Sequence, residues 1–520
     1  MNLLINKKYM ILSASFNAQK KRLYFYDGSK LVYDLVVALD YDAPDYHFPV
    51  NMERFNGKTL RIECDKDIEL CIELSDEAEL DYSGKYRPLA HFTSKRGWLN
   101  DPNGLVYIDG KYLMYYQHNP VATTWENMHW GSAVSTDLIH WQENGDVMFP
   151  DENGTVFSGS AIVDKHNVTG LKKGKSEVVL FFYTCAGSTS ETAKGKPFTQ
   201  NLAYSTDGGK TLICYEKPLI EQISEGNRDP KIIYFEQDNS YIMALFLEAH
   251  EFALFKSYNL FDWEEIQRIS LPDDAECPDF YPLRVEGEDE EKWVFSAASD
   301  RYYIGSFDGY KFRPESEQLR INYGNSSYAA QSWSDTPSGR RIRTAFATVI
   351  IPGMPFGSCM NIPQEMFLCR INQQLRLCAK PVDEIKSLYI NTKILENIHV
   401  SVNKSIKQKV NEKACDIELK IVSGVSFIIS LFGIEIKYDA IEKQLKIGEQ
   451  SALVMGENGT VTLRMIFDTV YAEIFADSGS IFMGMTYIQD SLLNTLEISA
   501  SEAVVEKLTI SELNRFFDLI

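Results

Sequence analysis

The sequence lacks any run of about 18 consecutive apolar residues, so a membrane-spanning helix is not expected. Its N-terminal apolar stretches are interrupted by Asn6, Lys7 and Lys8, and no small-residue cleavage site follows a long apolar core. A secretory signal peptide is therefore not expected either. Together these absences predict a cytoplasmic protein without a membrane partner.

Cysteine is sparse and is not arranged for disulfides or metal binding. The 520 residues include nine cysteines, an odd number, and no two of them form a Cys-x-x-Cys pair. Several, such as Cys185, lie in apolar runs, which favours buried, reduced thiols over a disulfide framework or a zinc site. His118 and His129 also lack companions at metal-ligand spacing. We therefore expect no metal and no other cofactor.

Positive charge is in deficit. The chain has 52 Lys and Arg residues against 73 Asp and Glu residues, which gives a formal net charge of −21. Nucleic acids and anionic membranes are bound through basic patches, so neither is an expected partner. A small neutral substrate is compatible with this charge, and a homo-oligomer is an open possibility.

Long amphipathic helical patterns are scarce, whereas strand patterns are frequent. Short runs rich in Tyr, Phe, Val and Ile, such as KYLMYYQH (111–118) and SEVVLFFYTC (176–185), are separated by turn residues. These runs predict an all-β protein. The best helical candidate is the final segment, 511–520, in which apolar residues recur at helical spacing: Leu513, Phe516, Phe517 and Ile520.

A loose repeat runs through the middle of the chain. Its copies are STDLIHW (135–141), STDGGKT (205–211), SYNLFDW (257–263) and SFDGYKF (306–312). Each copy follows an apolar strand and resembles the tip of a hairpin between two outer strands. Repeats of this size, each a few strands long, predict a β-propeller with roughly five four-stranded blades.

The predicted architecture has three parts. A five-bladed β-propeller spans residues 86–378, and strand patterns with short polar turns predict a C-terminal β-sandwich over residues 385–520. Residues 1–85 also show strand patterns and are predicted to form a small N-terminal β-domain. That domain could bind sugar, pack against the sandwich or mediate a dimer, and the sequence does not choose among these roles.

Four polar segments beside predicted strands carry the candidate chemistry. They are WLNDPNG (98–104), YQHNP (116–120), NRDP (227–230) and ECPD (276–279). Taken singly, each segment is a weak signal. An Asp-Pro turn is common, and an Arg beside an Asp is often only a surface ion pair that contributes little stability.

In this order and at these spacings, and together with FSGS (157–160), the segments resemble glycoside hydrolase family 32. This is the family of invertases, inulinases and levanases. The resemblance extends from about His91 to Phe312 and continues more weakly into the C-terminal region. It implies a five-bladed propeller followed by a β-sandwich, and a retaining β-fructosidase that releases terminal fructosyl units from sucrose or from inulin- or levan-type oligosaccharides.

The resemblance also implies a role for each residue at the matching positions. Asp101 would be the nucleophile that attacks the fructosyl C2, and Glu276 would be the general acid and then the general base. Asp229 would hold two fructose hydroxyls and stabilise the transition state, while Arg228 would hold a hydroxyl and orient Asp229. The other implied sugar contacts are Trp98, Asn100, Gln117, Trp125, Phe157 and Ser158.

Two features depart from the family pattern or leave the function open. Phe346 stands near a position where many relatives carry a Trp, so an indole hydrogen bond would be lost. The segment 354–363 looks more like exo-acting levanases and inulinases than like invertases.

The same residues would also serve other functions. A fructosyltransferase would use the same carboxylates with another acceptor. A non-catalytic fructan-binding protein and a structural propeller are further alternatives, but all three carboxylates are present.

Overall fold

The computed structural model describes every residue of the chain except 67, 79, 423, 457–458 and 518–520. Strands dominate this part, and its helices are short 3₁₀ turns: η1 (Glu53–Phe55), η2 (Pro337–Gly339), η3 (Asp383–Leu388) and η4 (Asp477–Gly479). This confirms the all-β prediction. Among the described residues, no helix has the length and apolar character needed to span a membrane.

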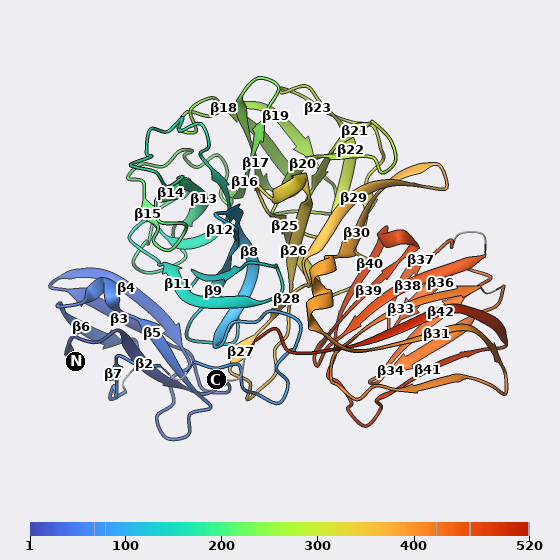
Figure 1. Ribbon diagram of the computed structural model, residues 1–520. Helices are drawn as coiled ribbons and strands as arrows, with labels where there is room; N and C mark the ends of the chain where they lie inside the picture. Colours follow the sequence, from blue (N-terminus) through green and yellow to red (C-terminus); the bar gives the residue numbers. More distant parts are fainter. Residues whose placement is uncertain (67, 79, 423, 457–458, 518–520) are drawn as a thin grey trace.

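Five antiparallel sheets, counted over the described residues, follow one another along the chain as the blades of a propeller (Figure 1). Blade 1 contains β8 (Gly97–Ile108), β9 (Lys111–Asn119), β10 (His129–Ser135) and β11 (Trp141–Met148). Blade 2 contains β12 (Thr155–Val163), β13 (Val179–Ala186), β14 (Phe198–Ser205) and β15 (Ile213–Cys214). Blade 3 contains β16 (Arg228–Phe235), β17 (Ser240–Glu248), β18 (Glu251–Ser257) and β19 (Glu264–Ser270).

The last two blades carry short extra strands. Blade 4 contains β20 (Asp279–Arg284), β21 (Glu291–Ser296), β22 (Arg301–Phe307) and β23 (Phe312–Pro314), with β24 (Leu319–Arg320) against β22. Blade 5 contains β25 (Ser327–Ser332), β26 (Arg341–Ala347), β29 (Gln364–Ile371) and β30 (Gln374–Pro381), with β28 (Cys359–Met360) against β26. The strand β27 (Phe356–Gly357), from the blade 5 region, pairs in parallel with β8 and so joins the last blade to the first.

The four sequence repeats are the turns between the third and fourth strands of blades 1 to 4. In each turn one Asx side chain accepts hydrogen bonds from backbone N–H groups further along the turn: Asp137, Asp207, Asn259 and Asp308. Such Asx turns satisfy backbone donors that no strand partner reaches. The repeat therefore reflects a turn requirement that recurs in each of the first four blades, as the hairpin-tip interpretation predicted.

In the part of the chain after the propeller that the structure describes, two six-stranded sheets face each other as a sandwich. One sheet has the order β31 (Tyr389–Ser401), β42 (Glu502–Leu513), β33 (Cys415–Val422), β38 (Thr460–Phe467), β39 (Tyr471–Ala476) and β40 (Ile481–Thr486). The other has the order β32 (Ile406–Lys409), β41 (Thr495–Ala500), β34 (Phe427–Leu431), β35 (Ile434–Asp439), β36 (Gln444–Ile447) and β37 (Gln450–Leu453). The propeller strand β30 runs to Pro381, beyond the predicted propeller limit at 378, because Pro381 still pairs with Gln364.

The N-terminal region forms two small sheets around a core of its own. One sheet has the order β1 (Asn2–Leu4), β6 (Thr59–Cys64), β3 (Lys21–Asp27) and β4 (Lys30–Val37), and the other has β5 (Tyr46–Asn51), β2 (Tyr9–Ala14) and β7 (Glu73–Ser75). Val121, a propeller residue that follows β9, is fully buried in this N-terminal core. The N-terminal domain and the sandwich lie on different sides of the propeller (Figure 1), so the domain packs on the propeller.

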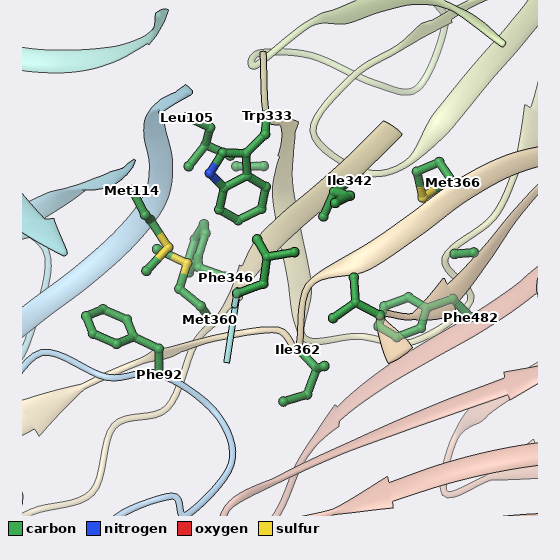
Figure 2. Packing of buried hydrophobic residues seen from close by; sticks show 14 of the residues in the cluster. Phe92, Leu105, Met114, Trp333, Ile342, Phe346, Met360, Ile362, Met366 and Phe482 are labelled. Atoms are coloured by element: carbon green, nitrogen blue, oxygen red, sulfur yellow. The ribbon is translucent and has the colours of Figure 1, made fainter. Parts of the chain in front are cut away.

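A single hydrophobic cluster joins blade 1, blade 5 and the sandwich. Figure 2 shows Leu105 and Met114 of blade 1 with Trp333 and Ile342 of the blade 5 region, and with Phe482 of β40. These side chains are nearly or completely buried. Because apolar burial contributes roughly 25 cal/mol per Å², this shared cluster holds the sandwich on the propeller.

The helix predicted over residues 511–520 is wrong where the structure describes it. Residues 511–513 complete β42, and residues 514–517 form no helix. The N–H of Phe516 donates to Leu89 O, and its ring packs against Tyr82 and Phe92 at centroid distances of 5.4 and 6.0 Å. The apolar spacing thus serves tertiary packing, and Ile520 lies outside the described residues.

All nine cysteines are free thiols. Five are buried, as predicted for Cys185: Cys185, Cys277, Cys359, Cys378 and Cys415. The expectation of buried thiols does not hold for Cys71 and Cys214, which are exposed.

Candidate active site

The innermost strands of the blades carry irregularities at the same end of the propeller. The register of the innermost strands shifts at 100–101 and 104–105 in β8, at 157–158 in β12, at 229–230 in β16 and at 329–330 in β25, and the first three of these strands carry candidate motifs. A β-bulge bends a strand and re-aims its side chains, and bulges often lie next to active sites. In blade 4 the corresponding turn, Glu276 and Cys277, comes just before β20, and both residues have positive φ.

The three acids predicted from the sequence meet at this end, around Cys277. The Sγ atom of Cys277 lies 3.7 Å from Asp101 Oδ2 and 3.5 Å from Asp229 Oδ2. The backbone N–H of Cys277 donates to Asp229 Oδ2 at 3.0 Å, and Glu276 precedes Cys277 in the chain. Two strands, β8 and β16, and the turn before β20 therefore bring Asp101, Asp229 and Glu276 into one cluster.

Asp101 is oriented by two donors. The Ser158 hydroxyl donates to its Oδ2 at 2.6 Å, and the Asn100 amide donates to its Oδ1 at 2.9 Å. The indole N–H of Trp98 in turn donates to Asn100 Oδ1 at 2.9 Å, which fixes the orientation of that amide. Burial raises the pKa of Asp101, while the bonds from Ser158 and Asn100 act in the opposite direction. The result is a carboxylate with both oxygens held in place.

Asp229 is the most enclosed of the three acids, with 6% of its surface exposed. Burial raises its pKa to about 7; Arg228 opposes this shift, and the charges of Asp101 and Glu276 add to it. Its backbone has φ of 65°, a left-handed conformation that is strained in a non-glycine residue. The N–H of Asp229 donates to the Thr184 hydroxyl at 3.0 Å, which helps to hold this conformation.

Glu276 faces solvent more than Asp229 does, because its side chain is 33% exposed. Arg228 Nη2 donates to Glu276 Oε1 at 2.6 Å, and the Tyr328 hydroxyl donates to Oε2 at 3.1 Å. The backbone φ of 59° is again left-handed. Gln331 donates to the carbonyls of Cys277 and Pro278 at 3.1 and 2.9 Å, so the turn that carries Glu276 is clamped from blade 5.

Arg228 lies between two of the acids, Asp229 and Glu276. Its Nε atom is 3.8 Å from Asp229 Oδ2, whereas its direct hydrogen bond goes to Glu276. The guanidinium also stacks 4.6 Å from the centre of the Phe246 ring. Arg228 therefore joins the charges of Asp229 and Glu276, and its closest carboxylate is that of Glu276.

The remaining sugar-contact candidates surround the acids. Gln117 lies opposite the bulge at 100–101 and is 2% exposed, and its Nε2 has no hydrogen-bond partner among the described residues. A buried donor without a partner is unfavourable unless a ligand accepts its hydrogen bond. The Trp125 ring is 50% exposed and meets the Phe157 ring edge-on at 6.2 Å. Phe157 and Trp125 thus form an apolar edge beside Ser158.

The phenyl ring of Phe346 packs edge-on between Trp98 at 6.5 Å and Tyr328 at 6.2 Å. It is 8% exposed. The ring therefore provides packing for two residues that hydrogen-bond within the site. As the sequence predicts, it offers no indole N–H to a substrate.

Sequence reasoning missed Tyr328, Gln331 and Thr184. Tyr328 is one of 28 tyrosines and lies in blade 5, for which the sequence offered no catalytic motif. Gln331 and Thr184 contact the backbone of site residues and have no local motif. The signal that could have found Tyr328 is its place on the innermost strand of the fifth blade, which is equivalent to the positions of the acids.

A metal site is not found in the part of the chain that the structure describes, where no group of three or more His, Cys, Asp or Glu residues is placed to hold an ion. The two histidines considered from the sequence have other partners. His118 Nε2 contacts Arg96 O at 2.9 Å, and its Nδ1 contacts Asp146 at 2.5 Å. The hydroxyl of Tyr33 donates to His129 Nε2 at 2.8 Å.

Comparison with known proteins identifies the family. Residues 91–381 match the model of the glycosyl hydrolases family 32 N-terminal domain. The chain is 30% identical to a levanase of Bacillus subtilis over 493 residues, which cover 84% of this chain and 71% of the levanase. It is 30% identical to an extracellular exo-inulinase of Meyerozyma guilliermondii over 429 residues, or 76% of this chain and 78% of that protein.

A solved structure supports the same assignment. The fructofuranosidase of Schwanniomyces occidentalis in complex with fructose superposes with a TM-score of 0.75 at 25% identity, covering 84% of this chain and all of that one. Its fold agrees with the propeller and sandwich described above. The chain belongs to glycoside hydrolase family 32.

Proposed function

We propose that this glycosidase is a retaining β-fructosidase that releases terminal β-D-fructosyl units from sucrose or short fructo-oligosaccharides. The observation that carries the proposal is the convergence of Asp101, Asp229 and Glu276, from three blades, on the Cys277 turn. The names of the relatives, levanase and exo-inulinase, support a fructosyl substrate.

In the first half-reaction, Asp101 attacks C2 of the fructosyl unit. A bond forms between a carboxylate oxygen and C2 while the bond from C2 to the leaving oxygen breaks, and Glu276 gives its proton to that oxygen. The hydrogen bonds from Ser158 and Asn100 hold the Asp101 carboxylate so that it need not reorient as it attacks. The product of this step is a covalent fructosyl-enzyme.

In the second half-reaction, Glu276 takes a proton from water as the water oxygen attacks C2. The bond from C2 to Asp101 breaks, and fructose leaves with its original anomeric configuration. Arg228 and Tyr328 contact the Glu276 carboxyl group and so keep it directed toward the reacting atoms. Asp229, which carries negative charge when ionised, would stabilise positive charge that develops on the ring through hydrogen bonds to ring hydroxyls.

A substrate panel tests the proposal. We expect free fructose from sucrose, kestose, inulin and levan oligosaccharides, with the first-formed fructose in the β configuration when followed by NMR. Short oligosaccharides should be preferred to polymers if the enzyme works in the cytoplasm, as the sequence predicts. Binding of fructan without release of fructose would instead favour a binding protein, and longer oligosaccharides formed at high sucrose would favour a transferase.

A further inference from the structure

The loop between β9 and β10, residues 120–128, carries Trp125 and contacts the N-terminal domain. Val121, at its start, is part of the N-terminal hydrophobic core and is fully buried there. Lys20 of the N-terminal domain lies 3.2 Å from Glu126, the residue next to Trp125. The apolar contact and the ion pair both tie this propeller loop to the neighbouring domain.

Asn127 makes the most specific of these contacts. The backbone N–H of Val36 donates to Asn127 Oδ1 at 2.8 Å, and Asn127 Nδ2 donates to Val36 O at 2.8 Å. The amide side chain thus pairs with β4 as the backbone of a neighbouring strand would. Asn127 has φ of 48°, a left-handed conformation that Asn tolerates better than most residues.

Two further hydrogen bonds link Asn127, through Asn119, to Thr124 on the other side of Trp125. Asn127 Nδ2 also donates to Asn119 Oδ1 at 3.0 Å, and Asn119 Nδ2 donates to Thr124 O at 2.8 Å. Asn119 is completely buried. The residues on both sides of the Trp125–Glu126 pair are therefore fixed by one network that begins at Val36 of β4.

His129 adds a buried contact at the end of the loop. Burial lowers its pKa to about 4, so the imidazole is neutral near pH 7. Its Nδ1–H then donates to Asn127 O, and its Nε2 accepts from the Tyr33 hydroxyl at 2.8 Å. Tyr33 belongs to β4, as Val36 does, so the same N-terminal strand holds the loop at two points.

The Trp125 ring itself is free to meet a ligand. It is 50% exposed and touches the Phe157 ring only edge-on, while the loop backbone around it is anchored. An aromatic face held at a fixed position binds a sugar ring with little loss of conformational entropy. A face on a loose loop would lose that advantage.

We propose that the N-terminal domain is part of the substrate site, and that Asn127 is the positioning residue through which β4 sets Trp125 against the bound sugar. This inference rests on the proposed function, because it assigns the ligand of Trp125 as a fructosyl oligosaccharide. The N-terminal domain would then contribute to substrate affinity, although all the catalytic motifs lie outside it in the sequence.

The test compares Asn127→Gly, Trp125→Ala and the double variant in the full-length enzyme. Glycine keeps the left-handed backbone of residue 127 accessible while it removes the side-chain bonds. We expect Asn127→Gly to raise KM for kestose about 10-fold and to leave kcat within about 3-fold, because substrate positioning is lost and the carboxylates are intact. Trp125→Ala should raise KM at least as much, and the double variant should equal Trp125→Ala.

A second readout follows Trp125 without any turnover. Trp125 is the one tryptophan among the described residues that is at least half exposed, so acrylamide quenching of tryptophan fluorescence is dominated by it. We expect a changed quenching constant in Asn127→Gly, and in Tyr33→Phe to a smaller degree. Lys30→Ala is the matched control, because Lys30 also lies in β4 but pairs with Glu152 at the exposed surface; it should change neither readout.

Unchanged KM and unchanged quenching in Asn127→Gly would overturn the proposal, and so would effects of the two single variants that simply add in the double variant. If the wild-type enzyme releases fructose while Asn127→Gly behaves like wild type, only this inference fails. If the wild-type enzyme releases no fructose from any substrate, the proposed function fails, and the quenching measurement still decides whether β4 positions Trp125.

Discussion

Two groups of acidic residues hold buried charge in this molecule, and they do so in opposite ways. At the junction of propeller and sandwich, Asp468 accepts hydrogen bonds from the backbone N–H groups of Leu89 and Ala90 and from the His91 ring at 3.0 Å. His91 Nε2 also lies 3.4 Å from Glu473, and His91, Asp468 and Glu473 are all completely buried. In this junction cluster the negative charges face a cation and backbone donors.

The catalytic cluster consists of the carboxylates of Asp101, Asp229 and Glu276. Its close cation is Arg228. Asp229 and Glu276 have left-handed backbones, and burial raises the pKa of Asp101 and of Asp229. Strain and incompletely paired charge persist only where the surrounding structure enforces them, and both gather at functional sites. The pairing of a buried acid, rather than its burial, therefore separates a structural role from a chemical one.

The largest effect is expected when one acid of the catalytic cluster is neutralised, because activity should fall while stability should not. Asp101→Asn should lower kcat by at least about 10⁴-fold, because the covalent route is lost. Its melting temperature should not fall, since the ionised carboxylate is disfavoured by burial in the folded enzyme. Fructose release and thermal unfolding of the same preparation measure both effects. Residual turnover within 100-fold of wild type would remove Asp101 from the chemistry.

Neutralising the junction cluster should give the opposite pattern. Asp468→Ala leaves His91 short of a counter-ion and several backbone donors without an acceptor, and we expect a loss of about 3–5 kcal/mol in stability. At temperatures where the variant is folded, kcat should stay within about 3-fold of wild type, since Asp468 touches none of the three catalytic acids. The control is Glu265→Ala, because Glu265 forms an exposed ion pair with Arg268 and should contribute about 1 kcal/mol or less. Equal denaturation midpoints for the two variants would contradict the assignment.

The junction cluster also predicts how wild-type stability changes with pH. Burial alone would lower the pKa of His91, but Asp468 and Glu473 raise it to about 9. A raised pKa in the folded state means that the contribution is complete below pH 6.5 and disappears as the pH rises through 9. We expect a loss of about 2–3 kcal/mol across this window, measured by denaturant titrations. A His91→Gln variant should be less stable at pH 6 and should have a flatter profile over the same range.

The sequence predicts more of the scaffold than of these two clusters. Turn chemistry and strand patterns repeat locally, so Asp137 and its counterparts mark the blades without any long-range information. The acids came from ordered motifs that resemble a family, but their left-handed backbones and the contact with Tyr328 depend on the closed ring of blades. Asp468 and Asn127 have partners more than 90 residues away, and a single sequence shows no pattern that pairs them.

Local spacing also misled the prediction at the C-terminus. Phe516 and Phe517 follow Leu513 at helical intervals, but Phe516 packs against Tyr82 and Phe92, which precede the first strand of the propeller. Tertiary burial of a short tail can produce the same apolar spacing as one helical turn. The assignment could be made only once the blades and the tail were placed together.

The smallest predicted effect concerns the stability that the enzyme loses by burying the ionised Asp229. The pKa of Asp229 is raised to about 7 in the folded enzyme, so folding favours its protonated form. The corresponding stability is complete below pH 3.8 and is lost as the pH rises through 7. Asp229→Asn should therefore stabilise the enzyme by about 1–2 kcal/mol at pH 8 while it impairs turnover.

At pH 5, where Asp229 is already protonated in the folded wild type, most of this gain in stability should vanish. Paired denaturation curves at the two pH values decide the matter: a gain that is equal at pH 5 and pH 8 would reflect better packing, and a loss at pH 8 would mean that Arg228 pairs Asp229 as fully as His91 pairs Asp468.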